Sequence, residues 1–308
     1  MLLILNSLLP IFAIIALGSA LRRIGWIDDF FIRSSDKLIY YIFFPCLLFW
    51  KIGKPSPAAG IEWAFILGVL CAVFLVFLMS LLFVKLFRVP DYEVGSFSQS
   101  CYRFSSYIGI AIILSAVGED GVRQFGILIG FVIPFINVLA VSSMIWYSRE
   151  SRSKKHRTTI MAKAIVSNPL ILACLAGIFY SKLGIPFPTF VAKTFELTSL
   201  LSLPLALISI GGSLTFSRSK DHLSNALMAA LFKLIVLPMV GYVLLKVFQA
   251  PPTPFKVAMI YFALPTSPQN YILSSQLNSD VDLATTSIVV STLLSTVSLS
   301  VILMAFAQ

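Results

Sequence analysis

Charged residues are scarce in this chain. Only 12% of its 308 residues are Asp, Glu, Lys or Arg, whereas 58% are hydrophobic and the mean hydropathy is +0.94. A soluble domain of this size carries roughly twice that share of charge, because its surface faces water. A membrane-spanning helix needs about 20 apolar residues, so the chain has room for roughly ten. The composition excludes a soluble protein and predicts an integral membrane protein in a lipid bilayer.

The sequence also lacks the spacings of common metal and nucleotide sites. Its two histidines, His156 and His222, fall in basic stretches, where we expect solvated side chains. No CxxC or Cys/His spacing occurs, which argues against disulfides and structural zinc, and no GxxxxGK[ST] loop is present to bind ATP. The cysteines are expected to be buried small hydrophobes. They are Cys46, Cys71, Cys101 and Cys174.

Carboxylates lie mostly at the ends of apolar segments. Asp280 and Asp282 resemble a DxD metal motif only superficially, and we predict a loop or helix-cap role for them. Hydrolysis inside a membrane needs a nucleophile with a base, or paired aspartates, at membrane depth. The sequence offers no such set. We therefore predict that the protein is not an enzyme and has neither a cofactor nor a metal site.

Ten hydrophobic segments follow one another along the chain. They lie near residues 3–21, 37–53, 62–86, 94–117, 124–147, 160–181, 190–214, 223–247, 255–277 and 283–306. The longest polar stretch, 148–158, divides them into five and five. We predict one all-α membrane domain made of a first five-span repeat (1–147), a basic cytoplasmic loop (148–159) and a second five-span repeat (160–308).

The two halves share their proline and glycine positions. Shifting the first half by 159 residues places Pro10 on Pro169, Gly18 on Gly177, Pro45 on Pro204 and Gly53 on Gly212. A shift of 161 places Lys85 on Lys246 and Pro90 on Pro251. A repeat with an odd number of spans must insert upside down relative to its twin. Such inverted repeats are typical of secondary transporters.

The basic residues predict the orientation in the membrane. Twice as many of the 23 Lys and Arg residues fall in loops on the side of 148–158 as on the opposite side. By the positive-inside rule this side is cytoplasmic, and both termini face away from the cytoplasm. The first segment is read as a retained span, because Arg22 and Arg23 follow it and no basic stretch precedes it. The net charge of +10 is thus an orientation signal, and nothing indicates a nucleic-acid partner.

Polar residues gather inside the fourth and ninth segments, which are equivalent in the repeat. The fourth reads "SFSQSCYRFSSYIGIAI" and the ninth "YFALPTSPQNYILSSQ". Helices interrupted at equivalent repeat positions are a sequence pointer to a transport site, whereas packing between helices is the alternative for single Ser and Thr residues. The predicted substrate-binding residues are Arg103, Ser105, Ser106, Tyr107, Gly109, Pro265, Thr266, Ser267, Gln269 and Asn270.

Arg103 is the strongest single candidate. A cation in the middle of a span is costly and usually functional, and the alternatives are snorkelling or contact with carbonyls exposed at a break. Lys233, in the eighth segment, is a weaker candidate, because it can snorkel or pair with a distant carbonyl. Ser105, Ser106 and Gly109 are expected to form the break of the fourth segment, and Tyr107 could wall the cavity or equally be a core residue.

Several stretches resemble the auxin efflux carrier family over nearly the whole chain. They are "LPIFAIIALGSALRRIG", "SNPLILACLAGIFYSKLGIPFP", "LPLALISIGGSL" and "ALPTSPQNYILSSQ", and "RFSSYIGIA" resembles the family's fourth-span motif. In that motif relatives commonly have Asn at or beside the position of Ser105, and often Pro near Ala111. The short central loop is similar to that of bacterial members.

The resemblance implies a fold and a mechanism. It implies ten transmembrane helices in two inverted five-helix repeats, with helices 4 and 9 broken and crossing, a fold similar to that of the bile-acid sodium symporters. It also implies an elevator-like movement, a small organic anion such as malonate, malate or an auxin-like acid, a bacterial plasma membrane, and a homodimer as a plausible assembly.

We therefore expect a secondary transporter that moves an organic anion by alternating access. Coupling to Na⁺ or H⁺ stays open, because neither crossover segment contains Asp or Glu and no convincing intramembrane acid or His is evident. A uniporter driven by the membrane potential is equally open. The alternatives are a membrane-embedded sensor that binds solute without moving it, and a channel, which inverted repeats with broken helices fit less well.

Overall fold

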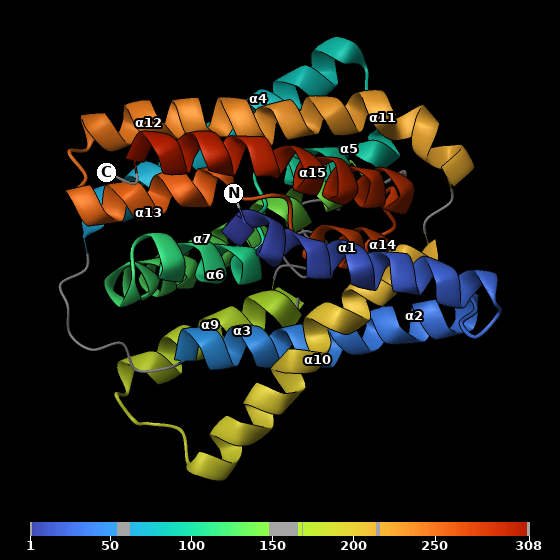
Figure 1. Ribbon diagram of the computed structural model, residues 1–308, viewed down its shortest axis with the longest axis horizontal. Coiled ribbons are helices and arrows are strands. Elements are labelled where there is room, and N and C mark those ends of the chain that lie inside the picture. The colour runs from blue at the N-terminus through green and yellow to red at the C-terminus, as the bar shows by residue number, and fades with distance from the viewer. Residues whose placement is uncertain (1, 54–61, 148–165, 168, 214–215, 307–308) are drawn as a thin grey trace.

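The computed structural model describes residues 2–53, 62–147, 166–167, 169–213 and 216–306, which are helical or in turns and contain no strand (Figure 1). The helices are α1 (Leu2–Arg23), α2 (Asp29–Leu38), the π-helical turn η1 (Ile39–Phe43), α3 (Phe44–Gly53), α4 (Trp63–Phe87), α5 (Asp91–Ser100), α6 (Ser106–Ala116), α7 (Glu119–Trp146), α9 (Pro169–Lys182), α10 (Thr189–Ser213), α11 (Phe216–Leu231), the π-helical turn η2 (Phe232–Val236), α12 (Leu237–Val247), α13 (Pro252–Ala263), α14 (Gln269–Gln276) and α15 (Val281–Phe306).

Five helical stretches are long and apolar enough to cross a membrane. They are α4, α7, α10, the continuous stretch α11–η2–α12, and α15. They coincide with the predicted segments near 62–86, 124–147, 190–214, 223–247 and 283–306. Helices suit this solvent, because they satisfy their own backbone groups where lipid cannot. The all-helical membrane fold is confirmed, and the arrangement as ten helices in two inverted repeats stays a prediction.

The helices pack in two groups. In the first group α1 packs along α10 and α3 along α9, while α2 continues into α3 through η1. In the second group α4 packs on α12, α11 on α15, and α5 on α7. Figure 1 shows α2, α3, α9 and α10 in its lower half and α4, α11, α12 and α15 in its upper half. Both broken segments, α5–α6 and α13–α14, belong to the second group.

Glycine makes the contact between α1 and α10 close. A Cβ atom on Gly211 would collide with the carbonyl oxygen of Ile15, and one on Gly18 would collide with that of Ile208. Small residues allow helix backbones to approach in this way in membranes, where packing rather than the hydrophobic effect drives association.

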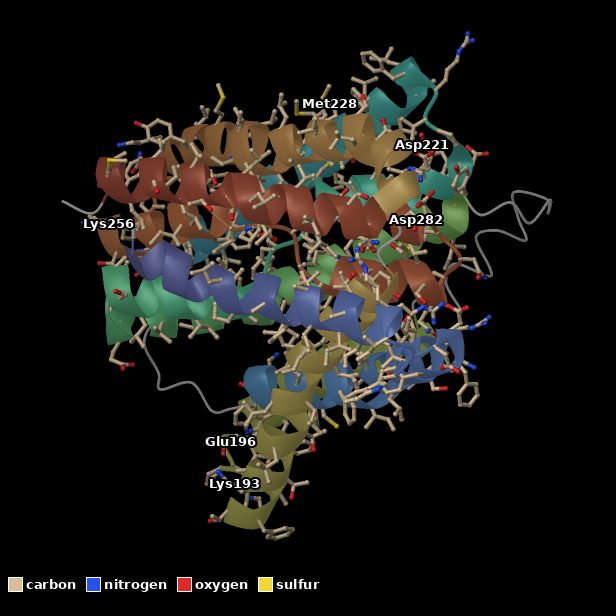
Figure 2. The ribbon with its side chains drawn as sticks, turned by 45° about the vertical axis from the view of Figure 1, so that its right-hand side comes forward. Lys193, Glu196, Asp221, Met228, Lys256 and Asp282 are labelled. Atoms are coloured by element: carbon tan, nitrogen blue, oxygen red, sulfur yellow. The ribbon has the colours of Figure 1, made fainter. Side chains whose placement is uncertain are left out.

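The outer surface is apolar along the helices and charged at their ends. Met239, Val297 and Met304 are more than 60% exposed, as expected for lipid-facing side chains. In Figure 2 Asp221 and Asp282 lie at one end of the second group and Lys256 at the other.

One expected boundary, the start of α11, was wrong. The stretch 217–222 lies between the predicted segments 190–214 and 223–247 and was expected to be a polar connection. It forms the first turns of α11, because the helix extends beyond its apolar part.

Candidate functional site

The breaks of the fourth and ninth segments meet. The fourth segment is interrupted between Ser100 and Ser106, and the ninth between Ala263 and Gln269. The backbone N–H of Ser105 donates to the carbonyl oxygen of Pro265 at 3.0 Å. Each break therefore brings one helix C-terminus and one helix N-terminus to the same place. The predicted interruption of both segments is confirmed.

Side chains satisfy backbone groups that the ninth break frees. The carbonyl oxygen of Ala263 accepts a hydrogen bond from Ser298 Oγ at 3.0 Å. The N–H of Thr266 donates to Ser291 Oγ at 3.1 Å. Both serines belong to α15. Unpaired backbone groups are costly at membrane depth, so α15 stabilises the break by supplying their partners.

Lys233 supplies a third partner to this break. Its side chain is fully buried (0% exposed), and its Nζ donates to the carbonyl oxygen of Phe262 at 3.1 Å. The ammonium also lies 5.4 Å from the centre of the Tyr261 ring. Lys233 therefore does not snorkel to the surface. It caps the C-terminal end of α13, where the helix dipole favours a cation.

Polar bonds tie the two broken segments to each other. Asn270 Nδ2 donates to Ser100 Oγ at 2.6 Å and to the carbonyl oxygen of Ser96 at 3.3 Å. Thr266 Oγ1 donates to the carbonyl oxygen of Ser100 at 2.8 Å. The side-chain donors of two predicted site residues, Thr266 and Asn270, are thus occupied by acceptors on α5. These bonds hold together the crossover, the place where the breaks 101–105 and 264–268 meet, and their role is structural.

Arg103 lies within the fourth break and is fully buried (0% exposed), which rules out snorkelling. Its Nη1 donates to Gln269 Oε1 at 3.2 Å and its Nη2 to Asn137 Oδ1 at 2.9 Å. Both of these acceptors are neutral amides. The surrounding stretches 94–118, 121–146 and 251–279 contain no Asp or Glu. The guanidinium is therefore held by amide oxygens of two other segments, α7 and α14.

Several polar atoms near Arg103 are buried without a hydrogen-bond partner in the part of the chain that the structure describes. They include Ser105 Oγ, on a side chain 2% exposed, and Asn137 Nδ2. Such atoms are rare in folded proteins, and they point to a ligand or water that completes them. Ser106 is half-buried at the start of α6, and Ser267 Oγ accepts from the N–H of Gln269 at 3.3 Å.

Of the remaining predicted residues, Pro265 lies at the site and Gly109 has a different role from the one predicted. Pro265 lies in the ninth break, and its carbonyl oxygen accepts the hydrogen bond from Ser105. The Tyr107 side chain lies outside the described residues. Gly109 does not form the break, contrary to expectation, because it lies inside α6. A Cβ on Gly109 would be 2.7 Å from Phe125 Cζ and 2.8 Å from Leu264 Cδ1, so this glycine allows α6 to pack closely.

Two polar residues of the site were not predicted. Asn137 comes from α7, and its signal was a lone amide in the apolar run "FVIPFINVLAV". Gln99 comes from α5, and its Nε2 donates to Ser274 Oγ at 3.1 Å. A buried acid was also missed. Asp36 of α2 is 1% exposed, and its Oδ2 accepts from Ser275 Oγ at 3.1 Å.

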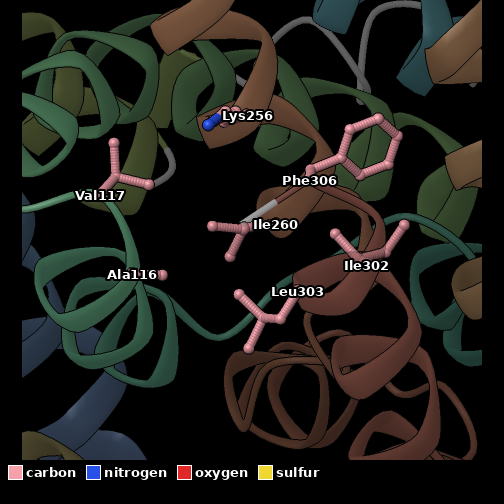
Figure 3. A pocket seen from close by; sticks show the side chains of 7 residues that line it. All are labelled: Ala116, Val117, Lys256, Ile260, Ile302, Leu303 and Phe306. Atoms are coloured by element: carbon pink, nitrogen blue, oxygen red, sulfur yellow. The ribbon is translucent and has the colours of Figure 1, made fainter. Parts of the chain in front are cut away.

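A separate hollow lies between the ends of α6, α13 and α15 (Figure 3). It is lined mainly by apolar side chains, and it has room for roughly one water molecule. Its lining residues are Ala116, Val117, Lys256, Ile260, Ile302, Leu303 and Phe306. None of them belongs to the two breaks, so the hollow is distinct from the crossover.

Comparison with known proteins defines the class. Residues 3–303 match the family described as "Membrane transport protein". The chain belongs to this family of transporters, which confirms the resemblance to the auxin efflux carriers.

Individual relatives match over nearly their full length. The chain is 23% identical to an uncharacterized transporter of Methanocaldococcus jannaschii over 295 residues, 94% of each chain. It is 23% identical to an uncharacterized transporter of Methanothermobacter thermautotrophicus over 299 residues, 96% of this chain and 95% of the relative. It is 24% identical to the protein named "Putative malonate transporter" of Rhizobium meliloti over 306 residues, 95% of this chain and 92% of the relative.

Proposed function

We propose that this membrane transporter is a secondary carrier that binds a small organic anion where the two breaks meet. Arg103 carries the proposal, because it places a fully buried positive charge at that point, beside the amides of Gln269 and Asn137. A carboxylate paired with a guanidinium gains two parallel charge-assisted hydrogen bonds. The name of the Rhizobium meliloti relative suggests malonate as the first substrate to test.

The ends of the helices support the same choice of charge. Both α6 and α14 begin at the breaks, at Ser106 and Gln269. The first amides of a helix have no intrahelical partner, and the dipole favours negative charge there. Paired half-helix N-termini beside a buried Arg form an anion-binding arrangement, as in other transporters with broken helices.

Inverted repeats are supported by the packing partners. The 159-residue shift places α1 on α9 and α3 on α10. A two-fold relation between the halves therefore makes the α1–α10 contact equivalent to the α9–α3 contact, and both contacts are present. Equivalent glycines lie at the two contacts. Gly18 lies at the α1–α10 contact, and its equivalent Gly177 lies at the α3–α9 contact. A Cβ on Gly53 would be 3.7 Å from the Cα of Gly177. This supports a two-fold relation between the halves.

The two groups of helices are the basis on which we propose alternating access. We infer that the group containing both breaks moves as a unit against the group of α1, α2, α3, α9 and α10. The bond between Asp36 of α2 and Ser275 of α14, 3.1 Å long, crosses this boundary and would break in an elevator-like movement. In this proposal the basic loop 148–158 is cytoplasmic and both termini face outward from a bacterial-type plasma membrane.

The test is uptake of radiolabelled malonate and malate into proteoliposomes of the purified full chain, with Na⁺, pH and membrane potential varied separately. We expect saturable uptake by the wild type and a loss of at least about tenfold in Arg103→Gln, because charge-assisted bonds contribute about 1.5–3 kcal/mol each. Arg22→Gln is the matched control, since Arg22 pairs with Asp29 at the surface at 2.7 Å.

Three outcomes are informative. Undiminished uptake by Arg103→Gln would contradict the role of Arg103. Binding of malonate without flux under every gradient would favour a sensor over a carrier. The gradient that drives uptake would identify the coupling ion, or show a uniporter driven by the potential.

A further inference from the structure

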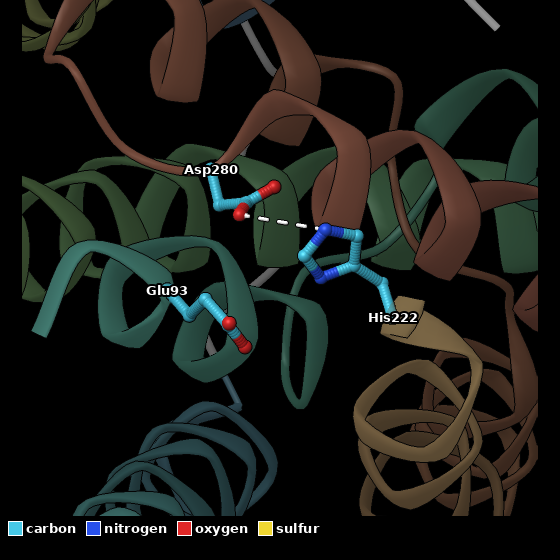
Figure 4. Close-up of side chains that lie close together, drawn as sticks. All are labelled: Glu93, His222 and Asp280. Atoms are coloured by element: carbon cyan, nitrogen blue, oxygen red, sulfur yellow. Dashed lines mark ion pairs between the residues drawn. The ribbon is translucent and has the colours of Figure 1, made fainter. Parts of the chain in front are cut away.

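Three side chains of metal-binding type lie together at the end of the molecule where α5, α11 and α15 begin (Figure 4). Glu93 is in the first turn of α5, His222 is in α11, and Asp280 directly precedes α15. One ligand atom of each lies within 4.8 Å of those of the other two. This group is separate from the breaks, and the sequence motifs did not predict it.

Burial makes the charges of this group costly. Glu93 is 6% exposed, Asp280 is 8% exposed, and the His222 side chain is 14% exposed. Glu93 Oε2 accepts from Asn225 Nδ2, a neutral donor, at 2.7 Å, and His222 Nε2 lies 3.8 Å from Asp280 Oδ2. Two buried carboxylates thus lie near one imidazole, which pairs with Asp280 alone in the described part of the chain. A divalent cation would neutralise both carboxylates, which a single imidazolium cannot do.

The backbone holds the two carboxylates in fixed positions. The N–H of Asp280 donates to the carbonyl oxygen of Tyr92, the neighbour of Glu93, at 3.0 Å. Ser96 Oγ, one turn further along α5, donates to the carbonyl oxygen of Asp280 at 2.6 Å. Asp280 Oδ1 caps α15 by accepting from the N–H of Leu283 at 2.7 Å, which leaves Oδ2 toward His222. The backbone that carries the two carboxylates is therefore fixed, and only side-chain adjustment is needed for an ion to bind.

We propose that Glu93, His222 and Asp280 bind a divalent transition-metal ion of the Zn²⁺ class. Two carboxylate oxygens and one imidazole nitrogen form a three-ligand set of the kind that holds Zn²⁺ with a fourth position open. The nitrogen ligand favours such ions over Ca²⁺ and Mg²⁺, which prefer oxygen alone. Ligand atoms around Zn²⁺ are about 3.4 Å apart. The ligand atoms here lie within 4.8 Å of one another, so binding requires each pair to close by at most about 1.4 Å.

The bound ion joins the broken segments from outside. Glu93 is on α5, the first half of the fourth segment, and Asp280 follows closely on α14, the second half of the ninth. An ion held between them and α11 clamps the same end of both segments. The site does not depend on which solute the crossover binds, and its test is separate from the transport assay.

Co²⁺ and Zn²⁺ binding to the purified full chain, prepared without a polyhistidine tag, tests the proposal. We expect saturable binding of one Co²⁺ per chain with visible d–d absorption, displacement by Zn²⁺, and a higher melting temperature with Zn²⁺, because an ion that binds the folded state stabilises it. Asp280→Asn and His222→Ala are each expected to weaken binding by more than about tenfold, since even the supports of metal ligands contribute 10–100-fold.

The controls separate a ligand role from a structural one. Asn caps helices as well as Asp does, so Asp280→Asn removes the charge without removing the cap of α15. His156→Ala removes the chain's other histidine and is expected to bind Co²⁺ like the wild type. No saturable Co²⁺ binding by the wild type would overturn the proposal. So would wild-type affinity in Asp280→Asn and His222→Ala, or loss of binding in His156→Ala alone.

Discussion

Arg103 and Asn137 are joined by a 2.9 Å hydrogen bond, although one lies in the break of the fourth segment and the other inside α7. The amide oxygen of Asn137 faces the buried guanidinium, while its Nδ2 has no hydrogen-bond partner in the described structure. Asn137 is therefore placed to orient the cation, with one donor left for a bound anion.

Asn137→Leu tests this relationship. The substitution removes both the acceptor for Arg103 and the unpaired donor while keeping the branching of the side chain. Hydrogen bonds to charged groups contribute about 1.5–3 kcal/mol, so we expect the KM for the transported anion to rise at least about tenfold. Uptake kinetics in proteoliposomes measure the effect, with Arg22→Gln at the surface as a control outside the two breaks. An unchanged KM would show that Asn137 does not position Arg103 for binding.

Ser105 and Ser100 form a matched pair for separating binding from stability. Ser105 Oγ has no hydrogen-bond partner among the described residues, whereas Ser100 Oγ accepts a 2.6 Å hydrogen bond from Asn270. Ser105→Ala should leave the melting temperature nearly unchanged and weaken anion binding. Ser100→Ala should lower the free energy of unfolding by about 1–3 kcal/mol, because it leaves a buried amide donor short of a partner. The reverse pattern would place the ligand elsewhere.

Lys233 is predicted to stabilise the fold without contacting the solute. Lys233→Met keeps the length of the side chain but removes the donor to the Phe262 carbonyl oxygen. We expect a loss of about 1–3 kcal/mol in the free energy of unfolding, with the affinity for the anion kept. Thermal unfolding and ligand binding measure the two effects. Lys246→Met, at an exposed position of α12, is the control. If affinity fell and stability did not, Lys233 would instead be a ligand of the anion.

The two breaks differed in how well they could be predicted. The ninth break is marked by Pro265 and Pro268, whose rings interrupt helical hydrogen bonding. The fourth break has no proline. The prediction that Gly109 forms this break was wrong, because the role of Gly109 is close packing inside α6. Arg103 was identified because a charge inside an apolar run is costly.

The partners of these residues could not be predicted from local patterns. Asn137 is 34 residues from Arg103, and Ser291 is 25 residues from Thr266, so only the packing of α7 and α15 brings them into contact. The same holds for His222 and Asp280. His222 was expected to be solvated but is mostly buried, because the start of α11 packs against α15. The cap role expected for Asp280 is confirmed by its bond to Leu283.

The contact between α1 and α10 gives the sharpest test of packing. Gly211→Ala places a methyl group against the backbone carbonyl of Ile15, and a backbone cannot move aside as a flexible side chain can. We expect the melting temperature to fall, with a cost of about 1–3 kcal/mol for overpacking. Gly126→Ala in α7 is the matched control, since its Cβ would meet nothing within 4 Å, and Ala favours a helix by up to about 1 kcal/mol. Equal stability of the two variants would show that α1 and α10 do not pack this closely in the membrane.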